Sequence, residues 1–370
     1  EIYLTSDTVT LQSHLNNAGL ELTDGSLKLR IWQTVEGGGS GGTVSQAWVR
    51  PFSDDGSSWP YYDITSDASG NIYVTGSVLA SNNYNDYLTV KYNSQGVEQW
   101  SATYNGPGDR NDYANAIAVD NHGNVYVTGR SAALRTGSME IRQYDYATVK
   151  YNADGIQQWV ARYDVSGYYD TATDIGVDSF GNVYVTGYGY VNSDDEYDYI
   201  TIKYDSDGVQ QWAERYNGTR GDSDCANAMA VDDAGNVYVT GWSDGVGSSS
   251  DYVTVMYDTD GIEQWVARYD GPGSSMDEAF AVAVDNAGNV YVTGASTGGT
   301  PGYPNYHTGY ATVKYNSSGI QQWASPYEGP LFNDTAKHIA VDASGNVYVC
   351  LLYTSPSPRD RTRSRMPSSA

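Results

Sequence analysis

The chain has 370 residues, of which 39% are hydrophobic, and a formal net charge of −25 at pH 7. This excess of acidic groups disfavours nucleic acids and anionic membrane surfaces as partners, and no run of about 18 apolar residues is present that would insert into a membrane. The aromatic residues are mostly tyrosine, with 35 Tyr and only 4 Phe, and the chain contains 41 Gly. This composition favours all-β structure with many tight turns.

The N-terminal part is irregular. Residues 1–25 are expected to end a preceding domain or blade. Residues 26–52 are expected to form a hairpin with an enlarged turn at 37–42. The segment around Trp48 resembles the segment around Trp159, so this hairpin is interpreted as the second half of a structural unit that recurs further along the chain.

From Gly70 onward, the segment Gly-Asn-Val-Tyr-Val-Thr-Gly recurs, with Ile72 for Val in its first copy. The copies begin at Gly70, Gly123, Gly181, Gly235 and Gly288, and a broken sixth copy begins at Gly345. A period of this length is typical of a repeat architecture in which each unit is one supersecondary structure.

Each repeat predicts two β-hairpins, which in the second repeat cover residues 116–129 and 146–163. In both turns an Asx residue stands three positions before a glycine, as Asp120 does before Gly123 and Asn152 before Gly155. The Asx side chain caps the turn and the glycine supplies the left-handed conformation. We name the four antiparallel strands A to D in chain order.

Strand C carries large side chains on both faces, so each four-stranded sheet is expected to be covered on both sides. A repeated sheet of this kind is a blade of a β-propeller. We therefore predict an all-β propeller over 26–349, with the Trp of each strand D anchoring its blade on the next. Five complete blades are predicted at about 61–106, 115–166, 173–218, 227–271 and 280–328, with partial blades at 26–52 and 336–349.

Residues 350–370 do not continue the repeat. The run from Cys350 to Asp360 resembles a translated sequencing adapter, so this segment is interpreted as an artefactual, disordered tail. The two cysteines, Cys225 and Cys350, form no disulfide framework.

The motifs Ala-Val-Asp-x-x-Gly-Asn-Val-Tyr-Val-Thr-Gly, ending at Gly129, and Asp-Tyr-x-Thr-Val-Lys-Tyr-Asn-x-x-Gly, ending at Gly155, resemble the bacterial SBBP repeat. The resemblance covers about residues 60–349, and the first motif alone is also similar to the NHL repeat. It implies a seven-bladed propeller within a secreted or surface protein, and no shared catalytic residues.

Repetition helps to separate folding residues from site residues, because a residue present in every blade is explained by a need of every blade. An aspartate recurs in each D–A loop and is expected to cap strand A. The alternative is a carboxylate ring at one channel mouth that binds Ca²⁺, and no other cofactor is expected. These residues are Asp112, Asp170, Asp224, Asp277 and Asp334.

The B–C loops vary most between repeats and share one face with the D–A loops, which we call the loop face. Aromatic residues gather in these loops, and aromatic rings beside carboxylates suit a sugar or a protein partner. The predicted binding residues are Tyr168, Tyr169, Tyr188, Tyr190, Trp242, Tyr303 and Tyr306.

No nucleophile elbow, phosphate loop or dinucleotide fingerprint is present. We therefore predict a non-catalytic binding or scaffolding module of a larger bacterial protein, extracellular or on the cell surface, that recognises a protein or glycan. The alternative is a carbohydrate-active enzyme, a glycosidase or polysaccharide lyase, that uses channel-mouth carboxylates, and a third possibility is an architectural spacer.

The number of blades in the closed ring has two predictions. Six blades result if the hairpin at 26–52 pairs with 336–349, whereas the family resemblance implies seven. Because an unclosed ring exposes strand edges, residues 1–349 alone are expected to self-associate.

Overall fold

The computed structural model describes residues 18–23, 26–35, 43–51, 63–133, 144–166, 168–191, 196–219, 221–245, 249–272, 276–298, 307–327 and 335–352. Every regular element in these ranges is a β-strand. None of them contains a helix that is long and apolar enough to cross a bilayer.

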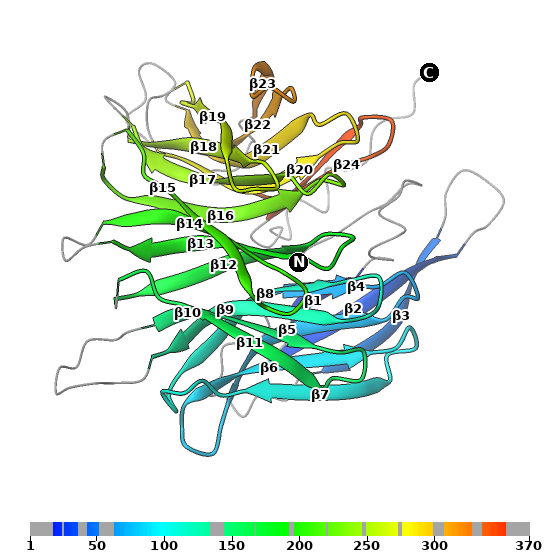
Figure 1. The fold of residues 1–370 in the computed structure, drawn as a ribbon. Helices are drawn as coiled ribbons and strands as arrows, with labels where there is room; N and C mark the ends of the chain where they lie inside the picture. Colours follow the sequence, from blue (N-terminus) through cyan, green and yellow to red (C-terminus); the bar gives the residue numbers. More distant parts are fainter. Residues whose placement is uncertain are drawn as a thin grey trace, which may run out of the picture.

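Five sheets of four antiparallel strands follow one another along the chain (Figure 1). We number them blades 1 to 5. Blade 1 comprises β4 (Asp63–Ser66), β5 (Ile72–Leu79), β6 (Asn85–Tyr92) and β7 (Glu98–Tyr104); blade 2 comprises β8 (Asp112–Val119), β9 (Val125–Ala132), β10 (Tyr144–Tyr151) and β11 (Gln157–Tyr163). Blade 3 comprises β12 (Asp170–Val177), β13 (Val183–Tyr190), β14 (Tyr197–Tyr204) and β15 (Gln210–Tyr216). Blade 4 comprises β16 (Asp224–Val231), β17 (Val237–Asp244), β18 (Ser250–Tyr257) and β19 (Glu263–Tyr269); blade 5 comprises β20 (Asp277–Val284), β21 (Val290–Gly298), β22 (His307–Tyr315) and β23 (Gln321–Tyr327). The predicted all-β propeller fold is confirmed.

Smaller sheets stand at both ends of this series. A two-stranded sheet joins β24 (Thr335–Val341) to β25 (Val347–Leu352), and β25 has β24 as its strand partner within the described residues. A three-stranded sheet joins β1 (Ala18–Thr23), β2 (Ser26–Val35) and β3 (Thr43–Pro51).

The hairpin β2–β3 has the register of a C–D hairpin. Ile31 pairs with Trp48, and the register then shifts so that Trp32 pairs with Gln46. In blade 2, Lys150 pairs with Trp159 and the register shifts in the same way. The N-terminal hairpin therefore shares a specific irregularity with the blades and not only a pair of strands.

The A–B turns are held by one aspartate each. In blade 2, Asp120 Oδ1 accepts the backbone N–H groups of His122 (2.8 Å) and Asn124 (2.9 Å). Its Oδ2 accepts the Asn124 amide and the Tyr126 hydroxyl. Gly123 adopts a φ of 78°, which a residue with a Cβ adopts only with strain. The capping role predicted for the Asx–Gly turns is confirmed here.

Alternation along strand B distributes the core between successive blades. Val125 and Val127 pack toward blade 1, against Tyr73 and Tyr87. Tyr126, between them in sequence, points to the opposite face and packs into the interface with blade 3. Because successive side chains of a strand point to opposite faces, one Val-Tyr-Val segment contributes to two interfaces. This requirement explains why the motif recurs in every blade.

The strand D tryptophans fasten each blade to the next. Trp159 of blade 2 donates its indole N–H to the carbonyl of Ser206 in the C–D turn of blade 3 (3.0 Å). Trp100, Trp212 and Trp265 make the equivalent bonds to Ala153, Thr259 and Ser317. The predicted anchoring of one blade on the next by these tryptophans is therefore confirmed at these four junctions.

Candidate functional site

The repeated aspartates of the D–A region are buried and belong to the inner strands. Asp112, Asp170, Asp224 and Asp277 are the first residues of β8, β12, β16 and β20, because pairing with strand B continues past a bulge to the aspartate. The prediction that these four aspartates lie in the D–A loops is therefore wrong. Asp334 lies outside the described residues.

Each of these four carboxylates accepts a backbone N–H from the loop that leads into its strand. The donors are Gly106 (2.6 Å), Val165 (2.8 Å), Gly218 (2.6 Å) and Gly271 (2.7 Å). Burial raises the pKa of all four aspartates, that of Asp170 to about 7. These contacts fit a capping role. Within the described residues the four carboxylates do not gather into one metal-binding group, although Asp277 lies beside two other carboxylates.

A cluster of aromatic rings occupies the loop face of blades 2 and 3. We call it the tyrosine–arginine cluster; its members are Tyr113, Tyr144, Tyr169, Tyr188, Tyr190, Tyr197 and Arg130. The ring centroids follow one another at 6.4 Å (Tyr113–Tyr144), 5.3 Å (Tyr144–Tyr169), 6.3 Å (Tyr169–Tyr190), 4.2 Å (Tyr190–Tyr197) and 5.3 Å (Tyr197–Tyr188). Apart from the buried Tyr144, the rings are half-buried.

Arg130 lies at the centre of the blade 2 part of the cluster. Its guanidinium carbon is 4.6 Å from the ring centre of Tyr113, 5.6 Å from that of Tyr144 and 5.3 Å from that of Tyr169. It also donates a hydrogen bond to the Tyr169 hydroxyl. Cation–π attraction and this bond hold the three rings in fixed positions.

Backbone bonds connect the cluster across the two blades. Tyr144 N of β10 donates to the carbonyl of Tyr168 (3.2 Å), and Tyr190 N of β13 donates to the carbonyl of Tyr169 (3.4 Å). Burial raises the pKa of Tyr188 to about 12, so its hydroxyl stays protonated at neutral pH. The cluster therefore presents fixed ring faces, together with a phenol hydroxyl that stays able to donate a hydrogen bond.

The structure brings together some of the predicted binding residues. Tyr169, Tyr188 and Tyr190 belong to the cluster, whereas Tyr168 contributes its backbone carbonyl. Trp242 is half-buried on blade 4, opposite Cys225 in the register, and no ring contact within the described residues links it to the cluster. Tyr303 and Tyr306 lie outside the described residues.

Sequence reasoning missed Arg130, Tyr113, Tyr144 and Tyr197. Arg130, Tyr144 and Tyr197 lie at the ends of the variable B–C loops predicted at 130–144 and 188–197, but they were not singled out as binding residues. A signal was nevertheless present. The residues at the position of Tyr144 in the other complete blades are Asn85, Tyr197, Ser250 and Thr308, and those at the position of Arg130 are Ser77, Tyr188, Trp242 and Ala295. Both positions depart from the repeat where the cluster lies.

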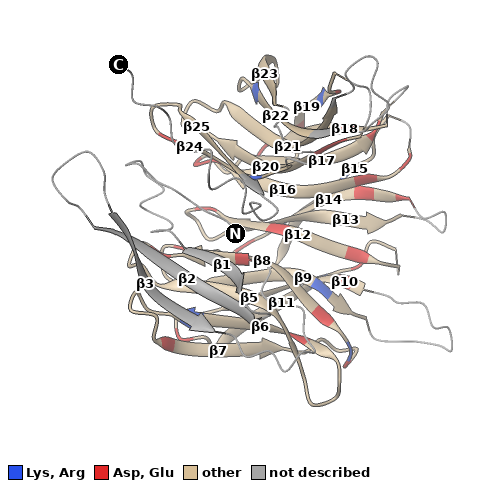
Figure 2. Cartoon of the chain, turned by 180° about the vertical axis from the view of Figure 1, so that it is seen from behind, with Lys and Arg blue, Asp and Glu red and all other residues tan. Residues whose placement is uncertain are grey.

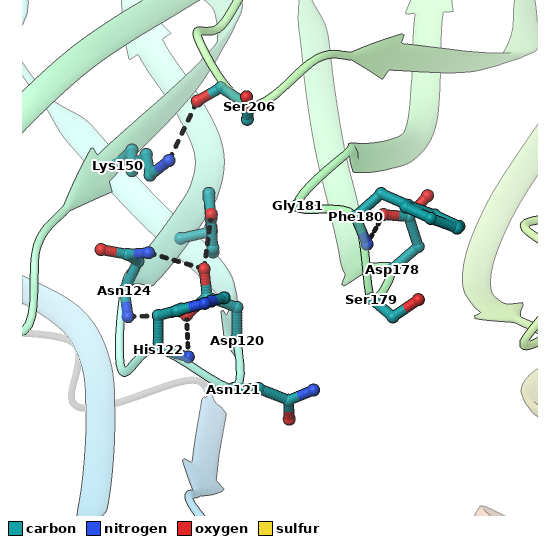
Figure 3. A pocket seen from close by; sticks show the side chains of 11 residues that line it. Asp120, Asn121, His122, Asn124, Lys150, Asp178, Ser179, Phe180, Gly181 and Ser206 are labelled. Carbon is teal, nitrogen blue, oxygen red and sulfur yellow. Dashed lines mark hydrogen bonds between the residues drawn. The ribbon is translucent and has the colours of Figure 1, made fainter.

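A cavity of about 180 Å³ lies on the opposite face, between the A–B turns of blades 2 and 3 (Figure 3). Its carboxylates are already used by their turns. Asp178 Oδ1 accepts two backbone N–H groups, and Oδ2 accepts Asn182 Nδ2 and the Tyr184 hydroxyl. Although burial raises the pKa of Asp120, its hydrogen bonds hold it below the usual value. Such groups are poor proton donors in catalysis.

Acidic side chains outnumber basic ones over the blades, so the field around the molecule is negative (Figure 2). Within this field Arg130 is a cation of the loop face whose guanidinium is surrounded by tyrosine rings of its cluster.

Comparison with known proteins supports the fold assignment. The model of the SBBP family, described as a β-propeller repeat, matches residues 99–133, 158–193, 211–247 and 264–300. No curated protein matches the chain.

Solved structures show weak similarity. A gluconolactonase from Xanthomonas campestris is 15% identical with a TM-score of 0.36, and the match covers 76% of this chain and 88% of that chain. A GH43 β-xylosidase/α-arabinofuranosidase from a compost microbial metagenome is 11% identical with a TM-score of 0.35, over 78% and 93% of the two chains. A neuraminidase-like protein of A/little yellow-shouldered bat/Guatemala is 8% identical with a TM-score of 0.43, over 77% and 92%. At these TM-scores the similarities carry no functional argument.

The period of the motif, the four-stranded blades and the four family matches agree with one another, and the chain between residues 99 and 300 is therefore built from SBBP β-propeller repeats.

Proposed function

We propose that the chain is a non-catalytic binding module that recognises a glycan or protein through the tyrosine–arginine cluster of its loop face. In this proposal it is one module of a larger bacterial protein, extracellular or on the cell surface. The observation that carries the proposal is the unbroken series of ring contacts from Tyr113 to Tyr188, with half-buried rings on two adjacent blades.

Aromatic rings of this kind suit recognition for two reasons. Their faces contact the C–H groups of a sugar or the apolar side chains of a protein, while the hydroxyls exchange hydrogen bonds. The rings are also held before any ligand arrives, by Arg130 and by the backbone bonds of Tyr144 and Tyr190. Little side-chain freedom is therefore lost on binding, which favours affinity.

The position of the cluster supports the same proposal. A ligand that spans more than one blade binds at one defined position only where adjacent blades differ. Identical blades would instead offer several equivalent weak sites. Blades 1 and 5 carry Ser77 and Ala295 at the position of Arg130, and Asn85 and Thr308 at that of Tyr144. The positions that form the cluster in blades 2 and 3 therefore lack its large side chains in blades 1 and 5.

The test is a glycan array followed by titration calorimetry on any hit. We expect Tyr169→Ala and Tyr190→Ala to weaken binding about tenfold or more, because each removes one stacking surface. Phe180→Ala is the matched control, since Phe180 is 78% exposed but lies on the opposite face. Equal affinities of Tyr169→Ala and the wild type would contradict the proposal.

The array also separates the alternatives. A uniformly negative array combined with capture of a protein that Tyr169→Ala fails to capture would favour protein recognition. Hydrolysis or eliminative cleavage of a bound glycan would overturn the non-catalytic assignment and favour a carbohydrate-active enzyme.

A further inference from the structure

Three carboxylates meet on the loop face between blades 4 and 5. Asp251 is the second residue of β18, Asp270 follows β19, and Asp277 begins β20. One oxygen from each lies within 4.8 Å of the others. Asp251 is 2% exposed and Asp277 is fully buried, while Asp270 is exposed to solvent. The cluster is therefore open on one side and buried on the other.

The charges of these carboxylates are only partly balanced. Arg268 Nη1 forms an ion pair with Asp251 Oδ2 at 2.8 Å. In blades 2 and 4 an arginine of strand D also lies near the aspartate that begins strand A, and its charge lowers the pKa of that aspartate against the effect of burial. Pro326 takes this position in blade 5. The pKa of Asp277 is instead raised, first by burial and then by the negative charge of Asp270 beside it.

The same replacement leaves a hydroxyl without its donor. Ser131 and Ser243 each accept a hydrogen bond from an arginine of strand D at 2.6 Å. Ser296 is the equivalent residue of blade 5, is 4% exposed, and its Oγ accepts no hydrogen bond in the described structure. Ser296 Oγ and Asp277 Oδ1 converge, since they lie 2.5 and 2.6 Å from the point where a Cβ on Gly271 would stand. A buried hydroxyl oxygen thus lies beside the Asp277 carboxylate.

We propose that Asp251, Asp270, Asp277 and Ser296 bind one Ca²⁺ ion between blades 4 and 5. All four supply oxygen ligands, which hard cations prefer. The oxygens of the three carboxylates lie within 4.8 Å of one another, which lets one ion contact all of them. Ca²⁺ suits them because it accepts irregular geometry, whereas Mg²⁺ demands a near-ideal octahedron and keeps several waters. The ion would supply the positive charge that an arginine supplies in blades 2 and 4. This site uses a single junction and not a ring of repeated aspartates.

Blade 4 shows why the neighbouring junction does not form the same site. There Asn217 takes the place of Asp270, and Arg268 donates to Ser243 Oγ. Arg268 also opposes the rise in pKa that burial causes at Asp224, which is the equivalent of Asp277. That junction already holds its compensating charge, so it needs no cation.

The experiment is titration of the whole chain with Tb³⁺, read by luminescence excited through tyrosine, followed by displacement with Ca²⁺. Tyr269 lies close enough to Asp277 to interact with it electrostatically, so it is placed to sensitise a bound lanthanide. We expect one saturable site that Ca²⁺ empties at millimolar concentration or below. Absence of saturable Tb³⁺ binding in this range would overturn the proposal.

Three variants make the assignment specific. Asp270→Asn removes an exposed ligand without disturbing the core and should weaken Ca²⁺ binding about tenfold or more. Asp260→Asn removes the same charge from the exposed C–D turn of blade 4 and should leave binding unchanged. Pro326→Arg should supply the missing guanidinium and abolish binding. If Asp270→Asn binds Ca²⁺ as tightly as Asp260→Asn, the site is refuted.

Discussion

Arg162, Arg215 and Arg268 occupy one position in strand D of blades 2, 3 and 4, and each forms an ion pair with an aspartate of strand C. Blade 5 carries neither partner, since Gly309 and Pro326 take the two positions. Three blades therefore keep both members and one blade loses both. In blades 2 to 5 the two residues are thus kept or lost together, which fits the cost of a buried carboxylate without its arginine.

Blade 1 keeps only one partner. Asp86 is 8% exposed and its Oδ1 has no hydrogen-bond partner, while Thr103 stands where the arginine would be. Burial, followed by repulsion from Asp112 and Asp109, raises the pKa of Asp86 to about 6.

We predict that Thr103→Arg stabilises the chain by about 1 kcal/mol at pH 7, because the guanidinium pairs with a carboxylate that now lacks a partner. The measurement is chemical denaturation at pH 7. Thr103→Gln is the control, as it adds a long polar side chain without charge. Equal unfolding free energies for the Arg and Gln variants would show that the Asp86 charge is not the cause.

At the residue scale the sequence predicted the repeated chemistry and missed the exceptions. The Asx–Gly turns follow from local rules, so Asp120 and Gly123 were identifiable directly. The states of Asp86 and Ser296 depend on an arginine that is absent from strand D, about thirty or fewer residues away in sequence. Only alignment of the repeats with one another, combined with knowledge of which faces meet, reveals such a missing partner.

At the element scale, the contact between a strand D tryptophan and the next C–D turn is the most regular junction. Trp159 donates to Ser206, and the ring lies directly over Gly208. A Cβ on Gly208 would stand 2.7 Å from Trp159 Cδ2. The glycine is therefore needed both for its φ of 80° and for the space that the ring takes.

We predict that Gly208→Ala destabilises the chain by about 1–3 kcal/mol more than Gly181→Ala. Gly181 has a φ of 81°, so both variants carry the strain of a left-handed alanine. At Gly181 the nearest atom to the added methyl is Ser206 Cβ at 3.5 Å, an ordinary contact. Thermal unfolding of both variants measures the difference, and equal losses would mean that the ring moves aside without cost.

At this scale, the local sequence pattern predicts the strands and turns of each blade but not where the inner strands begin. The sequence predicted the four-stranded blades, the turn positions and the role of Trp159, because the same residue pattern recurs in every repeat. The inner strands begin earlier than expected, at Asp112 in blade 2, since the bulge after Ala114 lets pairing continue beyond the apolar residues. The tyrosine–arginine cluster depends on the path of the D–A loop around Tyr169, which periodicity does not encode.

At the scale of the whole molecule, the two ends differ from the interior. Trp323 is 38% exposed and Tyr327 is 46% exposed, because no C–D turn among the described residues follows blade 5. In addition, no hydrogen-bonded ladder joins β25 to β1 or β3 within the described strands. Apolar surface and strand edges are thus available together.

We predict that residues 1–349, expressed alone, form species larger than a monomer, because these edges and rings can pair between copies. Light scattering coupled to size-exclusion chromatography measures the mass. Val349→Lys places a charge in β25 and should reduce association. A monodisperse wild-type monomer would contradict the prediction and indicate that the ends are already covered.

The tryptophan bonds have a consequence for how the molecule comes apart. Each of them joins one blade to the next, and so do the bridges from Asn115 to Ala172 and from Thr173 to Ala226. Cooperativity therefore spreads from neighbour to neighbour, as in a row of coupled units, rather than through a shared centre. Fraying should start at the outermost blades and proceed inward, so that amide hydrogens of blade 3 exchange with deuterium last.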